Sequence, residues 1–172
     1  MANKEGKKFE EDFKKSVPPD MWCYRFPDST AAWGGDDGGK TRFQAENICD
    51  FEIFFYGLFL IETKSHMGKS ITHQVFKYQG GKKKGQIKHL YELVAAMAFG
   101  INADVVINMR QIGETYSLPA DVVLNHILNS GIKSIPIAFM RENGYRLKQE
   151  LKRTRYRYDV KDLIENIRKE GI

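Results

Sequence analysis

The sequence lacks the long apolar runs and the cysteine patterns that mark several protein classes. No segment of its 172 residues approaches the roughly 18 continuous apolar residues of a membrane span, and the opening stretch MANKEGKKFEED contains no signal-peptide core. Cysteine is limited to Cys23 and Cys49, which form neither a spaced metal-binding pattern nor a disulfide framework. These absences argue against a membrane-spanning or disulfide-stabilised protein. We therefore expect a cytoplasmic protein whose two thiols are reduced and half-buried.

Acidic residues are absent from one long window and scarce in another. Between Thr63 and Tyr91 there is no acid but there are seven lysines, which are Lys64, Lys69, Lys77, Lys82, Lys83, Lys84 and Lys88. Between Arg141 and Arg157 seven basic residues stand against two acids. In a chain with a net charge of +5, two such windows indicate a surface for a polyanion such as a nucleic acid. A solvated basic face is the alternative that gives the same pattern.

Length and residue patterns predict one mixed α/β domain over residues 1–172. Apolar spacing indicates helices, whose expected ranges are 5–16, 86–99, 120–131 and 160–172. Apolar runs and period-two alternation indicate strands, whose expected ranges are 21–26, 48–64 as a hairpin, 103–109, 114–119 and 153–158. Residues 27–46 contain four glycines and are expected to form a flexible loop or short stalk. Residues 65–85 are expected to form a second irregular, basic stretch.

The hairpin sequence NICDFEIFFYGLFLIETKS carries acids and a lysine at the ends of two apolar strands. Glu62 and Lys64 are two residues apart, so they share one face of a strand. A three-residue loop over 55–57, with Gly57 in the left-handed position, sets Asp50 directly opposite Glu62. The two Cβ atoms would then lie about 4.5–5.5 Å apart. A two-residue loop would send Asp50 to the opposite face.

Two facing carboxylates repel each other unless a cation lies between them. Mg²⁺ is bound by one or two carboxylates, with waters and phosphate oxygens completing its shell, and Mn²⁺ is the alternative ion. Lys64 beside such an ion could position water or stabilise charge on a phosphate. The hairpin therefore predicts metal-assisted phosphodiester hydrolysis. Because acid-x-Lys occurs five times in the chain, a surface salt bridge at the strand end remains open. Glu52 is interpreted as a solvent-facing or supporting acid, with a metal ligand as the alternative.

The arrangement Asp50-x11-Glu62-Thr63-Lys64 resembles the PD-(D/E)xK nuclease superfamily. This resemblance implies a restriction-endonuclease-like core in which helices flank a central mixed β-sheet. The stretch EGKKFEED is similar to the Gly-x-x-hydrophobic-Glu opening of the RecU-type Holliday junction resolvases, with Glu10 at the acid. Two further stretches, GQIKHLYELVA and GIKSIP, are similar to the helix after the Glu-x-Lys strand and to an Arg-Lys-Ser-Ile-Pro segment of that family.

The resemblance implies a Mg²⁺-dependent homodimeric endonuclease that resolves four-way (Holliday) DNA junctions by paired nicks, in recombination and repair. It implies that Asp50, Glu62 and Glu10 hold the metal. Lys64 would act on the water or the scissile phosphate, and Gln86 would orient Lys64 or water. The host would be a bacterial cell or a phage-infected one. Neither a membrane partner nor a small-molecule cofactor beyond the metal is expected.

Basic residues in the windows and in the glycine-rich stretch are expected to contact phosphates, which position DNA without reading its sequence. They are Lys40, Arg42, Lys69, Lys82, Lys83, Lys84, Arg153, Arg155 and Arg157. Trp33 would stack on a base or fix its loop. His66 and His73 are interpreted as solvated loop residues, with DNA contacts, or a catalytic base for one of them, as the alternatives. Two other functions remain open. One is a restriction-like or homing endonuclease that cuts duplex DNA at a sequence, and the other is a non-catalytic DNA-binding protein.

Overall fold

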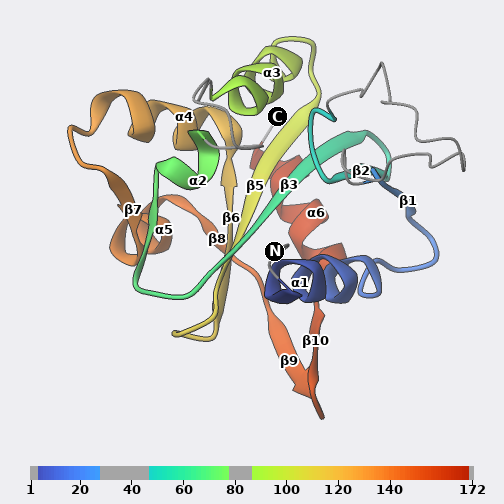
Figure 1. Cartoon of the computed structure of the whole chain (residues 1–172). Coiled ribbons are helices and arrows are strands. Elements are labelled where there is room, and N and C mark those ends of the chain that lie inside the picture. Colours follow the sequence, from blue (N-terminus) through green and yellow to red (C-terminus); the bar gives the residue numbers. More distant parts are fainter. Residues whose placement is uncertain (1–3, 28–46, 78–86, 171–172) are drawn as a thin grey trace, which may run out of the picture.

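A computed structural model of the chain describes residues 4–27, 47–77 and 87–170 (Figure 1). Its centre is a six-stranded sheet with the strand order β1-β2-β3-β5-β6-β8. These strands are β1 (Trp22–Arg25), β2 (Phe51–Phe54), β3 (Leu58–His66), β5 (Asn102–Met109), β6 (Glu114–Pro119) and β8 (Tyr145–Arg146). The β3–β5 pair is parallel and the other neighbouring strands are antiparallel, so the sheet is mixed, as predicted.

Helices cover both faces of this sheet. The helices are α1 (Lys4–Lys14), α2 (Gln74–Lys77), α3 (Lys88–Met97), α4 (Ala120–Asn129), α5 (Ile137–Asn143) and α6 (Val160–Glu170). Apolar residues of α3, α4 and α5 form one core with the sheet, and those of α1 and α6 form a second core on the other face (Figure 1). The α/β class with a flanked mixed sheet is therefore confirmed. None of the helices in the described ranges is long and apolar enough to cross a membrane.

Two short two-stranded sheets complete the described part. They are β4 (Ser70–Thr72) with β7 (Ser134–Pro136), and β9 (Gln149–Lys152) with β10 (Arg155–Tyr158). The expectation that residues 65–85 are irregular is wrong where they are described, because β3 runs on to His66 and is followed by β4 and α2. Ile71 and its β7 partner Ile135 are both fully buried, and this pairing orders the segment.

The β2–β3 hairpin has the register that the sequence predicts. Phe54 pairs with Leu58 across a three-residue loop, and the ladder continues to the pair Phe51–Ile61. The expectation that Gly57 is left-handed is wrong, because the left-handed residue is Tyr56, with φ 53°. A left-handed conformation costs a non-glycine residue roughly 1–2 kcal/mol. Here the exposed Tyr56 ring gains a contact with the Arg168 guanidinium, 5.6 Å from its centroid, which partly offsets that cost.

Candidate active site

Asp50, Glu62 and Lys64 lie at the start of β2, where β3 extends past the β2–β3 ladder while β5 remains paired with its other edge. Phe51 is the first residue of β2, whereas β3 extends from Ile61 to His66 past the last β2 pair. Within the described ranges no strand pairs with this outer edge of β3, so the backbone N–H of Thr63 needs another acceptor. Asp50 supplies it, since its Oδ2 accepts bonds from Thr63 N at 2.7 Å and from Thr63 Oγ1 at 2.6 Å.

Asp50 is thereby held in position from two sides. Its backbone carbonyl accepts a hydrogen bond from Phe26 N at 2.9 Å, continuing the β1–β2 ladder by one bond. Its carboxylate accepts the hydrogen bond from Thr63 N that the backbone carbonyl of a neighbouring strand would otherwise accept. The last β2–β3 pair is Phe51 with Ile61, so continuing the register by one residue sets Asp50 opposite Glu62, as the three-residue loop requires. The edge of β3 therefore presents two carboxylates together.

Glu62 and Lys64 lie on one face of β3 and form an ion pair, in which Lys64 Nζ donates to Glu62 Oε1. Glu62 is only 5% exposed. Burial raises the pKa of its carboxyl to about 7, and the charges of Asp50 and Glu10 add to this while Lys64 opposes it. Burial acts to lower the pKa of the Lys64 ammonium. The negative charges of Glu62, then Asp50 and Glu10, together outweigh burial, so the pKa of Lys64 is raised. The lysine is therefore held charged beside three carboxyl groups.

Two neighbours complete this cluster. Glu10, on α1, accepts hydrogen bonds at Oε2 from Arg25 Nε, at 3.1 Å, and from Arg25 Nη2. Cys49 is buried rather than half-buried as expected, whereas Cys23 is half-buried. Burial, followed by the charges of Glu62 and Asp50, raises the pKa of the Cys49 thiol to about 12. A protonated thiol therefore packs behind the carboxylates and is not a nucleophile.

The carboxylates fit a hard divalent cation in their chemistry. Asp50 and Glu62 supply oxygen donors, and the high pKa of Glu62 reflects burial and repulsion that a cation between them would relieve. In the described part of the chain no group of three or more His, Cys, Asp or Glu side chains is arranged to hold a metal ion. Glu10 faces Arg25 instead. The arrangement therefore matches an ion held by two carboxylates, with waters and phosphate oxygens as its other ligands.

The predicted DNA-contacting arginines have different surroundings in the β9–β10 ribbon. Arg153 and Arg157 are exposed, and among the described residues neither forms an ion pair. The Arg155 guanidinium instead contacts Glu11 Oε2 and the buried Asp12 Oδ1, each at 2.5 Å. Arg155 therefore holds the ribbon against α1.

Several predicted residues are placed elsewhere or not at all. Lys69 is exposed in the turn after β3. His73 is buried against His126, with ring centroids 5.6 Å apart, so its interpretation as a solvated loop residue is wrong. The remaining residues lie outside the described ranges, and they are Gln86, Lys40, Arg42, Lys82, Lys83, Lys84 and Trp33.

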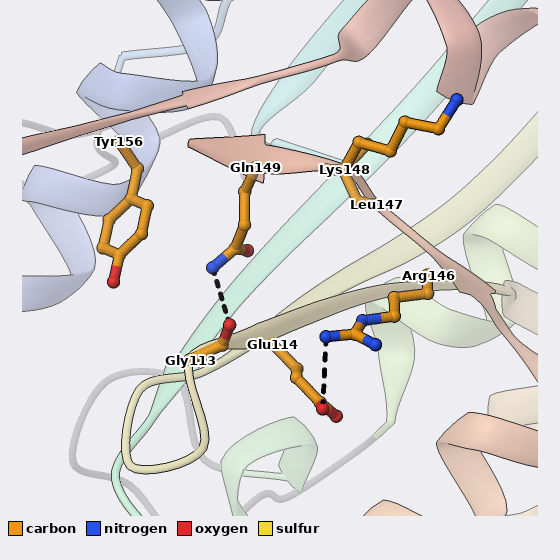
Figure 2. A pocket seen from close by; sticks show the side chains of 7 residues that line it. All are labelled: Gly113, Glu114, Arg146, Leu147, Lys148, Gln149 and Tyr156. Atoms are coloured by element: carbon orange, nitrogen blue, oxygen red, sulfur yellow. Dashed lines mark hydrogen bonds and ion pairs between the residues drawn. The ribbon is translucent and has the colours of Figure 1, made fainter. Parts of the chain in front are cut away.

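A pocket elsewhere on the molecule contains none of the predicted catalytic residues. It lies between the β5–β6 turn and the ribbon, and its lining residues are Gly113, Glu114, Arg146, Leu147, Lys148, Gln149 and Tyr156 (Figure 2). Gln149 Nε2 donates to the Gly113 carbonyl at 2.8 Å, and Glu114 is paired with Arg146 at 3.3 Å (Figure 2). The charged groups that line this pocket are paired with other protein groups, so we interpret it as a place where the β5–β6 turn packs against the ribbon and not as a ligand site.

Sequence reasoning missed two residues that support the site. Thr63 lies between the predicted residues but only its contact with Asp50 gives it a role. Arg25 ends β1, and nothing in its local sequence indicates that it reaches Glu10 on α1. Both contacts join segments that are distant in the chain, so periodicity carries no signal for them.

Comparison with known proteins supports the resemblance seen in the motifs. No protein-family model matches the chain. Two curated proteins named Holliday junction resolvase RecU, from Lactococcus lactis subsp. cremoris strains SK11 and MG1363, are 34% and 33% identical to it over 64 residues. The matched segment is 37% of this chain and 29% of each relative, so the chain spans less than a third of their length. Both names belong to the family that the motifs resemble, which confirms that resemblance.

One solved structure that is distantly similar to this chain is also described as a Holliday junction resolvase. It is that of Hjc from Archaeoglobus fulgidus, described as a Holliday junction resolvase from an archaeal hyperthermophile. The match covers 80% of this chain and 89% of Hjc, with a TM-score of 0.40 and 15% sequence identity. At this level the likeness carries no functional conclusion.

Proposed function

We propose that the chain is a divalent-metal-dependent endonuclease that resolves four-way DNA junctions by paired nicks. The observation that carries the proposal is the hairpin register, which sets Asp50 next in line opposite Glu62 with Lys64 on the same face. Asp50, Glu62 and Lys64 meet at the edge of β3 that no strand covers in the described part of the chain, and the scissile phosphodiester would approach there. The similarity to the two RecU proteins supports the choice of a junction as substrate.

Asp50 and Glu62 would hold the ion, Mg²⁺ or Mn²⁺, with Glu10 acting directly or through water. A bound ion would supply a Lewis acid and lower the pKa of a coordinated water. Glu62 must be ionised to bind it, and the charged Lys64 beside it favours that state. Thr63 fixes one oxygen of Asp50 through two hydrogen bonds, which leaves the other carboxylate oxygen for a ligand.

Lys64 would act on the reacting groups themselves. Its ammonium is already charged and half-buried, so its hydrogen bonds would be strong and well oriented. A lysine placed at the scissile phosphate stabilises the negative charge that grows in the transition state. Strand β3 places Lys64 two residues from Glu62 and therefore fixes this geometry through the backbone.

The β9–β10 ribbon would contact the DNA backbone. It extends beyond the six-stranded sheet, at the end where β5 turns into β6 (Figure 1). Arg153 and Arg157 are exposed on it, while Arg155 fixes it to Glu11 and Asp12 of α1. Helix α1 also carries Glu10, so the ribbon and the carboxylate cluster are joined through one helix. Phosphates held by the ribbon would thus be set at a fixed distance from the cluster.

Paired nicks need two active sites, so we propose that two copies of the chain act as a homodimer. A two-fold arrangement would apply the same patch of surface from both copies. The junction has matching symmetry, since its two cut strands are equivalent.

A comparison of substrates tests this function. The wild-type protein should cut a synthetic four-way junction in Mg²⁺ and leave a linear duplex of the same sequence largely intact. Asp50→Ala should abolish cutting but keep junction binding in EDTA, while Glu52→Gln, on the same strand, should cut normally. Preferential cutting of the linear duplex at one sequence would instead identify a sequence-specific endonuclease. Cutting by Asp50→Ala would show that the assigned site is wrong.

A further inference from the structure

Two basic residues are joined through their backbones at the end of the strand that carries Lys64. His66 is the last residue of β3. It is two residues after Lys64 and four after Glu62, and even spacings on a strand put side chains on one face, so the three share a face of β3. Arg110 directly follows β5, and its N–H donates to the His66 carbonyl at 2.9 Å. At about 3.3 Å per strand residue, His66 lies about 6.6 Å beyond Lys64. This is comparable to the step from one DNA phosphate to the next.

The positive charge of Arg110 is poorly matched by protein groups. Its nearest carboxylate is Glu5, whose Oε2 lies 3.9 Å from Arg110 Nη1, and the Glu5 side chain is 51% exposed. Such long, solvated pairs contribute little. In addition, Arg110 Nε is buried and has no hydrogen-bond partner within the described part of the chain. A buried donor without an acceptor is costly, so the protein does not fully satisfy this guanidinium.

His66 places an imidazole ring near the Arg110 charge. Burial, and then the charge of Arg110, lowers the pKa of its imidazole. The ring rests over Gly68, where a Cβ would lie 3.3 Å from His66 Nε2, and φ at Gly68 is 145°. Glycine therefore leaves room for the ring in the turn, and the exposed Lys69 follows directly. An imidazole with a lowered pKa is neutral at pH 7, and its ring N–H can donate one hydrogen bond to an anion.

We propose that Arg110 and His66 form a phosphate-binding subsite that holds the phosphodiester next to the one cut at Asp50 and Glu62. The inference rests on the proposed function for the identity of the anion, which is a backbone phosphate of DNA. The guanidinium suits it, because the Arg110 side chain is 26% exposed and its accessible nitrogens can donate to anionic oxygens. The subsite would position the strand and would not read its sequence.

Junction binding in EDTA tests the subsite without any cleavage. The affinity of wild-type protein and of Arg110→Gln for a synthetic four-way junction is measured by fluorescence anisotropy between 0.1 and 1 M salt. Loss of one phosphate contact should reduce the slope of log K against log salt by about 0.9, which makes the variant about eightfold weaker at 0.1 M when the affinities are equal at 1 M. Arg168→Gln is the matched control, since Arg168 contacts the loop at the opposite end of the hairpin.

A second readout is independent of the variant's folding. The His66 ring is titrated by NMR in wild-type protein, with and without junction in EDTA, and its pKa should rise when a phosphate binds beside it. Equal salt slopes for wild type and Arg110→Gln, or an equal loss in Arg168→Gln, would overturn the proposal. If Arg110→Gln fails to fold, an unchanged His66 titration would overturn it and a raised pKa would support it. Failure of the wild type to cut junctions in Mg²⁺ would count against the proposed function instead.

Discussion

The buried carboxyl of Glu62 should make the stability of the metal-free protein depend on pH. Burial, together with the charges of Asp50 and Glu10, raises its pKa from 4.5 to about 7. The folded protein therefore holds this proton more tightly than the unfolded chain. The resulting stabilisation is fully present below pH 4.5 and is lost as the pH rises through 7. The difference between the two pKa values corresponds to about 3 kcal/mol.

Urea unfolding of wild type and Glu62→Gln in EDTA, from pH 4.5 to 8, measures this effect. The free energy of unfolding of wild type minus that of the variant should fall by about 3 kcal/mol over this range. Taking the difference removes the groups that titrate alike in both proteins, and in wild type the raised pKa of Lys64 keeps this lysine charged throughout. The half-buried Glu52 gives a matched control, Glu52→Gln, which should follow wild type. A difference that is flat, or that grows with pH, would refute the reasoning.

Three further predictions concern the same cluster and the ribbon. The apparent affinity for Mn²⁺ should rise about tenfold per pH unit up to about pH 7, because Glu62 must lose its proton to bind the ion. Titrations that give the same Mn²⁺ affinity at pH 6 and at pH 7 would contradict this. Thr63→Val should cost about 1–3 kcal/mol in urea unfolding and slow junction cutting more than it weakens binding, while Thr63→Ser keeps both, because the hydroxyl bond to Asp50 is retained. Arg155→Ala should lower the Tm because it leaves the buried Asp12 without its charged partner. The exposed Arg157→Ala should keep the Tm and reduce the salt dependence of DNA binding. Equal effects of the two arginine variants on Tm would show that Arg155 does not hold the ribbon.

The register of the catalytic hairpin could be predicted because it depends on local rules. Buried residues alternate along β2, and one loop length sets which residues face each other. The preference for glycine places the left-handed residue of that loop at Gly57, one position after Tyr56, where it lies. Glycine is the usual residue there, but the contact of Arg168 with Tyr56 comes from a helix more than 100 residues away and leaves no local trace.

The surroundings of the ribbon arginines also depend on contacts between segments that are far apart in the sequence. The alternation in RTRYRY correctly indicates that Arg157 is exposed and Tyr158 is buried. It gives no sign that Arg155 is held by Glu11 and Asp12, which lie at the other end of the chain. A basic residue in a basic window was therefore predicted to contact DNA, although its charge is already matched within the protein.

The central claim is that Asp50 and Glu62 together hold one divalent cation. Titration of Mn²⁺ at pH 8, followed by the EPR signal of the free ion, tests it most directly with three proteins. The account predicts one bound ion per chain in wild type and in Glu52→Gln, and loss of that ion in Asp50→Asn. Binding that survives in Asp50→Asn, or that is lost in Glu52→Gln, would contradict it.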